Sequence, residues 1–386
     1  MSEIPYKHIC VLIMPTDYCN MNCVYCFNSR RSATEKNIIS DENLKKIFDI
    51  TIPYYEDIRF IWHGGEPLSV GKEFYENVLK LQSEYNTKNT TIKNSIQTNL
   101  SLMTDDFAKF LVENNFYVGS SFDGTKNEFT RHNTAKILEG HETLKKAGGH
   151  NGFICVIQNE NINSLKEDYE WFKSNGINYN LNKYLSADNK NDKLYVPPKI
   201  YAQKICEFFD YWMFDKSCNI SVSYYDNFIK YILFNEKNLC CYNSCMGKHI
   251  GIHYDGNIYG CNRDFPDKYC YGNINDYSDI HQCFESKGFK ELLKDSIERR
   301  KRCKEKCKIY DFCAGGCNSV ALTAGDIKKN NQEDCHSLFL IYSYIEEKIN
   351  KWKNEDENEI AERLNPYVSK LLLKYKKGGK EDGVLL

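Results

Sequence analysis

The sequence predicts an α/β protein: a partial (β/α)6 barrel, followed by a small Cys-rich domain and C-terminal helices. Two observations lead to this fold class. First, short apolar or β-rich runs alternate six times with longer helical patterns, which is typical of βαβ units around a parallel sheet. Second, the composition then changes to a stretch dominated by cysteine and finally to charged helical segments. Right-handed crossovers can curl six βα units into an open barrel.

The expected elements follow one another through the first half of the chain. Strand-like runs cover 8–14, 58–62, 92–97, 116–122, 152–158 and 177–185, and helical patterns cover 41–50, 72–85, 105–114, 135–147, 165–175 and 199–214. Ser40 and Thr104 are predicted N-caps, Ser164 and Glu167 a capping box, and Gly176 a helix end. Further helices are expected over 337–352 and 357–374.

The length of 386 residues suggests more than one domain, because single cores stop growing at roughly 250–300 residues. We divide the chain into a barrel (1–235), a Cys-rich domain (236–336) and C-terminal helices with a tail (337–386). The net charge is −2, and phosphate binding needs clustered Lys and Arg, so nucleic acid is not an expected partner. No run approaches the ~20 apolar residues of a membrane span, and 9–14 is too short for a signal peptide. We expect a cytoplasmic protein, in which a total of 18 cysteines indicates metal or cluster binding rather than disulfides. Cys10, Cys155, Cys206 and Cys218 fall in strand or helix patterns and are expected to be packing residues.

Three cysteines follow the first predicted strand with the spacing C-x3-C-x2-C: Cys19, Cys23 and Cys26. Three thiolates on one short loop can hold three corners of a 4Fe–4S cube, which leaves the fourth iron without a protein ligand. A zinc loop is the alternative, but structural zinc takes four ligands and no fourth Cys or His lies nearby in the sequence.

Further motifs come at the carboxyl ends of the next predicted strands. His63-Gly64-Gly65-Glu66-Pro67 follows the second strand, Gln97-Thr98-Asn99 ends the third, and Ser121 to Gly124 ends the fourth. In parallel β/α barrels the chemistry is located on these loops, so we expect them on one rim. Glycines let the backbone approach a ligand closely, and the Glu66 carboxylate suits a cationic amino group, although such a loop alone is more often a simple turn.

Together these motifs resemble the radical S-adenosylmethionine (SAM) enzymes, whose open iron chelates the amino and carboxylate groups of SAM. The resemblance implies that Tyr25 lies by the adenine, that His63 to Glu66 form the glycine-rich SAM motif, and that Ser121 contacts the ribose. Arg131 would pair with the SAM carboxylate, with an exposed arginine at a helix start as the alternative, and Gln97 is the weakest candidate. The implied cofactor-binding residues are Tyr25, His63, Gly64, Gly65, Glu66, Gln97, Ser121 and Arg131.

The Cys-rich stretch contains Cys245-x10-Gly256-x4-Cys261 and Cys307-x5-Cys313-x3-Cys317-x17-Cys335. This arrangement resembles the SPASM extension of radical SAM enzymes, which carries two auxiliary 4Fe–4S clusters. In one respect the chain departs from the family: Cys303 and Cys307 are spaced C-x3-C, where C-x2-C is usual.

Applied to the cysteines of this sequence, the resemblance implies two sets of ligands for the auxiliary clusters. Cys245, Cys261 and Cys317, completed by Cys240 or Cys241, would hold the first cluster, and Cys303, Cys307, Cys313 and Cys335 the second. Asp255-Gly256 is predicted to form a hairpin turn that presents Cys261, and Gly315-Gly316 a tight turn after Cys313. A pair of zinc sites is the alternative for these thiols.

The resemblance also implies a mechanism. A reduced cluster cleaves SAM to methionine and a 5′-deoxyadenosyl radical, which takes a hydrogen atom from a substrate carbon. The expected cofactors are SAM and three 4Fe–4S clusters. The expected partners are a peptide or protein substrate and a flavodoxin- or ferredoxin-type reductant.

Two subfamilies compete for the substrate. Peptide maturases install thioether, carbon–carbon or related crosslinks in ribosomally synthesised peptides, whereas anaerobic sulfatase-maturating enzymes make formylglycine. The latter resemble this chain in length but carry an Asp after the Gly-x4-Cys cysteine; here that position is Asn262, which cannot act as a base. Asp264, two residues further on, is a weak substitute. The sequence alone therefore favours peptide maturation, with sulfatase maturation as the alternative and a non-catalytic iron–sulfur electron carrier as a further one.

Overall fold

The structure is a computed structural model that describes residues 7–28, 34–186, 192–243, 245–263 and 265–379. The chain divides into two compact units. Unit 1 comprises 1–122, 128–151 and 245–297, and unit 2 comprises 123–127, 152–244 and 298–386. The boundaries of these units differ from those of the three domains expected from the sequence. The three domains stay a prediction.

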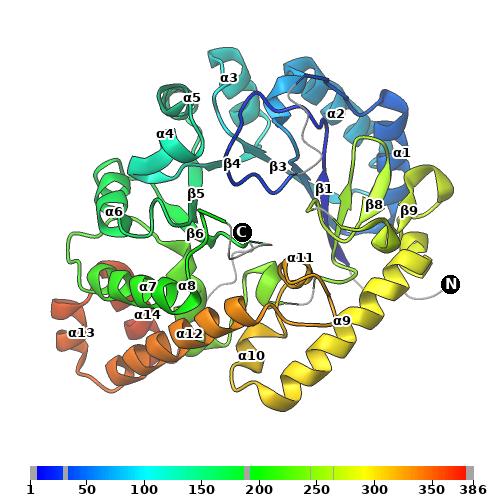
Figure 1. Cartoon of the computed structure of the whole chain (residues 1–386). Helices are drawn as coiled ribbons and strands as arrows, with labels where there is room; N and C mark the ends of the chain where they lie inside the picture. The colour runs from blue at the N-terminus through cyan, green and yellow to red at the C-terminus, as the bar shows by residue number, and fades with distance from the viewer. Residues whose placement is uncertain (1–6, 29–33, 187–191, 244, 264, 380–386) are drawn as a thin grey trace. The chain divides into compact units, whose positions relative to one another are not determined.

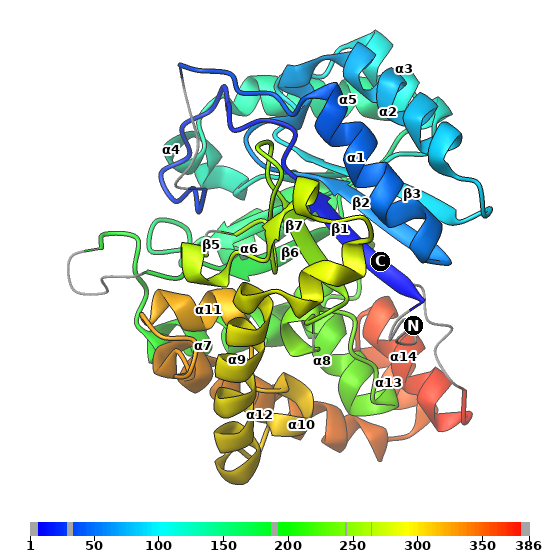
Figure 2. The same ribbon diagram turned by 90° about the vertical axis from the view of Figure 1, so that its right-hand side faces the viewer.

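Unit 1 is built on a largely parallel sheet with the strand order β4-β3-β2-β1-β7-β8-β9. Strand β7 runs parallel to β1 and lies directly beside it (Figure 2), whereas β8 and β9 continue the sheet as antiparallel strands. Along β1 and β2 alternate apolar side chains are buried, including Val11, Ile13, Phe60 and Trp62. The strands are β1 (His8–Ile13), β2 (Asp57–Trp62), β3 (Thr91–Thr98), β4 (Tyr117–Ser121), β7 (His249–Ile252), β8 (Asn257–Tyr259) and β9 (Gly272–Asn273).

Helices cover the outer side of β1 to β4 (Figure 1). The Ser40 hydroxyl accepts a bond from Asn43 N at 3.1 Å, and the Thr104 hydroxyl accepts one from Phe107 N at 3.2 Å, so both predicted N-caps are confirmed. The helices of this part are α1 (Asp41–Thr51), α2 (Lys72–Tyr85), α3 (Asp105–Glu113), α4 (Asn127–Thr130) and α5 (Thr134–Lys146).

Unit 2 contains the parallel pair β5 (Asn151–Ile157) and β6 (Tyr179–Lys183) and a group of helices. Helix α12 packs along α7 and α8 (Figure 2). The helices are α6 (Leu165–Ser174), α7 (Pro198–Met213), α8 (Ser223–Phe234), α10 (Tyr310–Cys313), α11 (Asn318–Thr323), α12 (Gln332–Lys353), α13 (Glu357–Arg363) and α14 (Pro366–Lys376); α9 (Lys287–Lys306) has residues in both units.

The α/β class with a parallel sheet and C-terminal helices is confirmed, with two local corrections. The Ser164 hydroxyl donates to Asn161 O and the Asp168 carboxylate instead of capping α6, so the capping box with Glu167 is wrong. The helix expected over 357–374 is two helices, because Pro366 cannot donate the backbone bond that continuation needs. Helices α8 and α9 were not predicted.

Among the residues that the structure describes, we find no helix with the length and apolar character needed to cross a bilayer.

Candidate active site

The cysteine loop follows the carboxyl end of β1 and brings three thiols together. Burial, with smaller contributions from the nearby charges of Glu66, Cys23 and Cys26, raises the pKa of the Cys19 thiol to about 12. Cys26 is exposed, whereas Cys19 and Cys23 are half-buried. The predicted grouping of these cysteines is therefore present in the fold, with Glu66 as their neighbour.

Three thiols on one short loop fit three corners of a 4Fe–4S cluster. Within the described ranges, no three His, Cys, Asp or Glu side chains converge on one point where a metal ion could bind. A cube does not require such convergence, because each thiolate binds a different iron. Cys19, Cys23 and Cys26 would hold such a cluster.

The Gly64-Gly65 loop packs directly on the cysteine loop. Gly65 N donates to Thr16 O at 3.0 Å, and Glu66 N donates to Tyr18 O at 2.7 Å. A Cβ atom at Gly65 would lie 2.0 Å from Tyr18 O, and one at Gly64 would lie 2.3 Å from Met14 Cγ. The close approach of the two loops thus explains both glycines, a reason that the sequence did not reveal.

Glu66 is buried and its carboxylate is held by three donors. One oxygen accepts from Leu68 N at 2.9 Å and from Thr98 Oγ1 at 2.6 Å, and the other accepts from Asn99 N at 2.8 Å. Burial raises the pKa of Glu66, and these bonds together with the Arg131 charge oppose the rise. A carboxylate offers about four acceptor positions, so one remains for a ligand ammonium group.

Arg131 lies in this site and not on an exposed helix start. Its side chain is 8% exposed, and Nη1 donates to the Tyr25 hydroxyl at 3.0 Å. The structure therefore brings together Tyr25, Arg131 and Glu66, which the resemblance assigned to different parts of SAM. Their contacts with SAM stay a prediction.

Gln97 and Ser121 are also neighbours, at the carboxyl ends of β3 and β4. Gln97 Nε2 donates to Ser121 Oγ at 3.4 Å. A Cβ atom at Gly119 would lie 2.3 Å from Gln97 Oε1, so a larger residue in β4 would displace this side chain. Their predicted role beside SAM is untested.

Thr98 and Asn99 contribute more than the sequence indicated. Thr98 is one of the donors to Glu66, and Asn99 Nδ2 donates to Asn20 Oδ1 on the cysteine loop at 3.0 Å. Both lie in the Gln97-Thr98-Asn99 stretch that was expected at a strand end. Only the fold shows that these side chains connect the loops after β1, β2 and β3.

His63 follows β2 and lies near an aromatic ring and a cation. Its ring centroid is 5.8 Å from that of Phe27, and the Arg263 guanidinium lies 4.8 Å from the Phe27 centroid. Burial, with a smaller effect of the Arg263 charge, lowers the pKa of His63 to about 4. His63 is therefore neutral at physiological pH.

Unit 1 also contains two of the predicted auxiliary ligands, Cys245 and Cys261. The Asp255-Gly256 turn between β7 and β8 is confirmed, and Gly256 has a φ of +85°. Cys261 Sγ donates to Asn262 Oδ1 at 3.5 Å, and Asn262 is 6% exposed. Cys240, Cys241 and Cys317 belong to unit 2, so ligation of the first auxiliary cluster stays a prediction.

The four thiols predicted to hold the second auxiliary cluster gather in unit 2. Burial raises the pKa of Cys313 to about 12, and Cys335, Cys303 and Cys307 are among the charges that add to this rise. Cys307 N donates to Cys303 O at 2.8 Å, as in a helix. The C-x3-C spacing therefore places both cysteines one turn apart on one side of the helix end, and their role as ligands stays a prediction.

Arg299 organises the loop around these cysteines and was missed in the sequence, where it is one of many basic residues in a helical pattern. Its side chain is 1% exposed. Its guanidinium donates to four acceptors: Gly315 O at 3.0 Å, Gly316 O at 3.2 Å, Ile327 O at 2.6 Å and Asn318 Oδ1 at 2.6 Å. The predicted turn at Gly315-Gly316 is confirmed by φ values of +81° and +76°.

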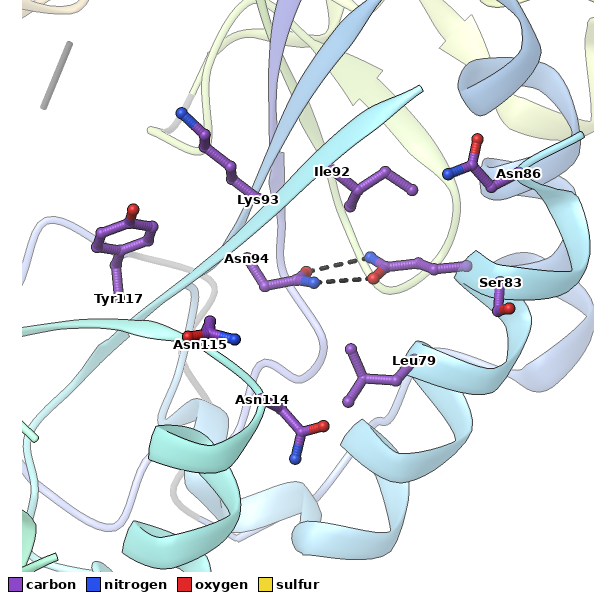
Figure 3. A pocket seen from close by; sticks show the side chains of 10 residues that line it. Leu79, Ser83, Asn86, Ile92, Lys93, Asn94, Asn114, Asn115 and Tyr117 are labelled. Carbon is purple, nitrogen blue, oxygen red and sulfur yellow. Dashed lines mark hydrogen bonds between the residues drawn. The ribbon is translucent and has the colours of Figure 1, made fainter. Parts of the chain in front are cut away.

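A polar cleft of about 430 Å³ lies elsewhere in unit 1, between α2 and the amino-terminal parts of β3 and β4 (Figure 3). At its base, the side-chain amides of Gln82 and Asn94 exchange bonds of 2.8 and 3.1 Å. Tyr117, the first residue of β4, also lines it. The cysteine loop follows the opposite strand ends, so this cleft is not part of the candidate site.

The similarity to known proteins agrees with this geometry. A family model described as the radical SAM superfamily matches residues 13–172. The cysteine-type anaerobic sulfatase-maturating enzyme of Clostridium perfringens is 30% identical, and the alignment covers 86% of this chain and 95% of that enzyme. This chain belongs to the anaerobic sulfatase-maturating family of radical SAM enzymes.

A second relative and a solved structure are also similar to most of this chain. The serine-type anaerobic sulfatase-maturating enzyme of Bacteroides thetaiotaomicron is 26% identical over 92% of this chain and 94% of that enzyme. A solved structure described as native anSMEcpe with bound AdoMet and Cp18Cys peptide has a TM-score of 0.80 and 28% identity, and covers 89% of this chain and 99% of that one.

The predicted radical SAM identity is therefore confirmed, and the protein is an enzyme. The radical SAM superfamily implies SAM and a 4Fe–4S cluster as cofactors. Of the two substrate classes left open by the sequence, the relatives favour sulfatase maturation, and peptide crosslinking is supported only at the level of the superfamily.

Proposed function

We propose that this enzyme oxidises a cysteine residue of a peptide or protein substrate to formylglycine. The observation that carries the proposal is the similarity to the cysteine-type enzyme of Clostridium perfringens, which extends over 95% of that enzyme. The grouping of Cys19, Cys23 and Cys26 beside Glu66 supports it.

Different residues of unit 1 would bind the cluster, the SAM ammonium group and the SAM carboxylate. Cys19, Cys23 and Cys26 would hold a 4Fe–4S cluster that, when bound, supplies the 5′-deoxyadenosyl radical from SAM, and further clusters would supply an electron acceptor. Glu66 offers its free acceptor position to the SAM ammonium group, and Arg131 offers its charge to the SAM carboxylate. The hydrogen bond from Arg131 to Tyr25 fixes the guanidinium beside the ring proposed to lie by the adenine.

The proposed oxidation removes two electrons and two protons from the substrate cysteine. The Cβ of the substrate cysteine loses one hydrogen atom, the thiol loses its proton, and one electron leaves the resulting radical. The product is a thioaldehyde, which water hydrolyses to the aldehyde with release of hydrogen sulfide. The step that needs a proton acceptor is the loss of the thiol proton.

Asn262 favours a cysteine over a serine substrate for this step. It replaces the Asp expected from the family, and an amide cannot take a proton. A cysteine thiol has a pKa of about 8.5 and ionises partly without help, whereas a serine hydroxyl depends on a base. Loss of a general base typically costs about 10²–10⁴ in rate, so a serine substrate would be the one lost.

Paired peptides test this proposal. Anaerobic reduced enzyme and SAM are incubated with two sulfatase-type peptides that differ only in Cys or Ser, and aldehyde is detected with a hydrazide. We expect aldehyde on the Cys peptide alone, and on the Ser peptide only after Asn262→Asp. Robust formation of 5′-deoxyadenosine without aldehyde on either peptide would contradict the proposal.

The second candidate is a maturase of ribosomally synthesised peptides, which Asn262 favours because such an enzyme can bind its substrate thiol to an auxiliary iron without a carboxylate base. A thioether or carbon–carbon crosslink in place of an aldehyde would identify it. Three clusters in total, a flavodoxin- or ferredoxin-type reductant and a cytoplasmic location belong to both proposals. Iron content near twelve atoms per chain would support the three clusters.

A further inference from the structure

We propose that Arg263, beside Asn262, binds a carboxylate of the peptide substrate next to the residue that is modified. The ligand is an Asp or Glu side chain or a C-terminal carboxylate. This inference rests on the proposed function and names a feature of its substrate.

Arg263 is positioned at the active-site loops of unit 1. Its guanidinium lies 4.8 Å from the ring centroid of Phe27, which directly follows Cys26. The Phe27 ring lies 5.8 Å from that of His63, at the end of β2. Phe27 is 38% exposed, so it is accessible at the surface of unit 1. A guanidinium attracted to the face of a ring uses no hydrogen-bond donor for that contact, so its N–H groups stay available.

Among the residues that the structure describes, none accepts a hydrogen bond from the Arg263 guanidinium. Over the described ranges Arg263 makes no hydrogen bond and no ion pair, whereas Arg299 donates to four acceptors. Arg363 offers a matched comparison, because it also lies over an aromatic ring, at 5.4 Å from Trp352, but pairs with Glu359 at 3.5 Å. Among the described residues Arg263 thus differs from both of these arginines, as expected if its partner is a substrate carboxylate.

The charge around Arg263 favours an anion. His63 is neutral at physiological pH, and Glu66, the buried carboxylate of this site, is held by Leu68, Thr98 and Asn99. Among the described residues, Arg263 is thus a cation that lies over Phe27 and near a neutral His63, which favours an anionic ligand. The planar fork of arginine matches a carboxylate with two parallel hydrogen bonds.

Asn262 supplies the second, independent observation. It is 6% exposed, and its Nδ2 is buried without an acceptor among the described residues. A buried amide donor without a partner costs roughly 1–3 kcal/mol, which a ligand oxygen would recover. An Asp at this position would carry a negative charge that repels a carboxylate. The replacement of Asp by Asn therefore removes the base and supplies a neutral donor at the residue that precedes Arg263.

A peptide array tests the inference without turnover. The probes are Cys-containing peptides that carry Asp, Asn or Lys at each single position around the cysteine, bound to reconstituted enzyme in the presence of SAM. We expect Asp to be preferred at one position close to the cysteine. Arg263→Gln should weaken binding of that Asp peptide by roughly 10- to 100-fold and leave the Asn peptide unchanged. Arg263→Lys should keep part of the preference for the Asp peptide. The matched control, Arg363→Gln, should keep the whole preference.

The outcomes separate the two proposals. Binding of the array without any preference for Asp, or a preference that survives Arg263→Gln, overturns the inference but not the proposed function. Absence of binding by every peptide overturns both.

A second arm identifies the source of the carboxylate. The affinities for SAM and for decarboxylated SAM are compared in the unaltered enzyme and in Arg263→Gln. An unchanged ratio supports the substrate as the ligand, whereas loss of affinity for SAM alone assigns Arg263 to the SAM carboxylate and overturns the substrate assignment.

Discussion

Asn330 Nδ2 donates a hydrogen bond of 2.9 Å to the Sγ of Cys303. Burial raises the pKa of Cys335 to about 12, and the Asn330 side chain acts against this rise. Cys303 lies in α9 and Cys335 in α12, so one amide influences two thiols of the predicted second auxiliary set from different elements. A hydrogen-bond donor at a ligand sulfur stabilises negative charge there.

We expect Asn330→Leu to lower the reduction potential of the second auxiliary cluster. Hydrogen bonds to the sulfurs favour the reduced, more negative state, and leucine has a similar size but no donor. The measurement is a redox titration followed by electron paramagnetic resonance, with iron content unchanged. Asn350→Leu, at an exposed position of α12, is the control. An identical potential in the Asn330 variant would show that this amide does not bond to a cluster ligand.

Replacement of Cys19, Cys23 and Cys26 together by Ala should remove about four iron atoms per chain and abolish SAM cleavage. The physical reason is that these thiols hold the cluster with the open iron. Iron analysis and chromatography of 5′-deoxyadenosine provide the measurement, and Cys206→Ala in α7 is the control. Persistent 5′-deoxyadenosine in the triple variant would refute the assignment of the loop.

Glu66→Gln should weaken SAM binding by about 10-fold or more, because a charge-assisted bond to the ammonium group becomes a neutral one. Burial raises the pKa of Glu66, so SAM affinity should also fall as the pH is lowered through that raised value. Equilibrium binding measures both effects. Thr98→Val, which removes one donor to Glu66 and keeps its charge, serves as the comparison. Equal losses in the two variants would assign Glu66 to loop packing alone.

The lowered pKa of His63 predicts that stability depends on pH. In the unfolded chain this histidine takes up a proton near its ordinary pKa of 6.5, but in the folded protein only near 4. The unfolded state therefore binds more protons between these values, and the free energy of unfolding should fall as the pH decreases from about 6.5 to about 4. His63→Gln should flatten this slope, measured by chemical denaturation at several pH values, whereas the exposed His150→Gln should leave it unchanged.

Arg299→Lys should lower the free energy of unfolding by at least about 2 kcal/mol, because lysine cannot reach the four acceptors and leaves buried carbonyl groups unpaired. Iron bound in unit 2 should also decrease, since the loop from Cys313 to Cys317 loses its support. Denaturation and iron analysis are the measurements. Arg302→Lys, on the exposed side of the same helix, should change neither.

The sequence alone predicted those features that depend on near neighbours in the chain. The alternation of strands and helices, the caps at Ser40 and Thr104, the turns at Gly256 and Gly315, and the three-cysteine loop all follow from local periodicity, local hydrogen bonds and short spacing. The radical SAM family was visible for the same reason, because its cluster loop is a short motif.

The tertiary structure decided the features that join distant segments. The donors of Glu66 come from the loop after another strand, Arg299 reaches a loop 16 residues or more away, and Asn330 meets Cys303 across 27 residues. A side-chain hydrogen bond depends on which segments the fold brings within about 3 Å, and no local pattern records that. For the same reason the sequence could show that Asn262 is no base, but only the fold places Arg263 beside Phe27 with no hydrogen-bond or ion-pair partner among the described residues.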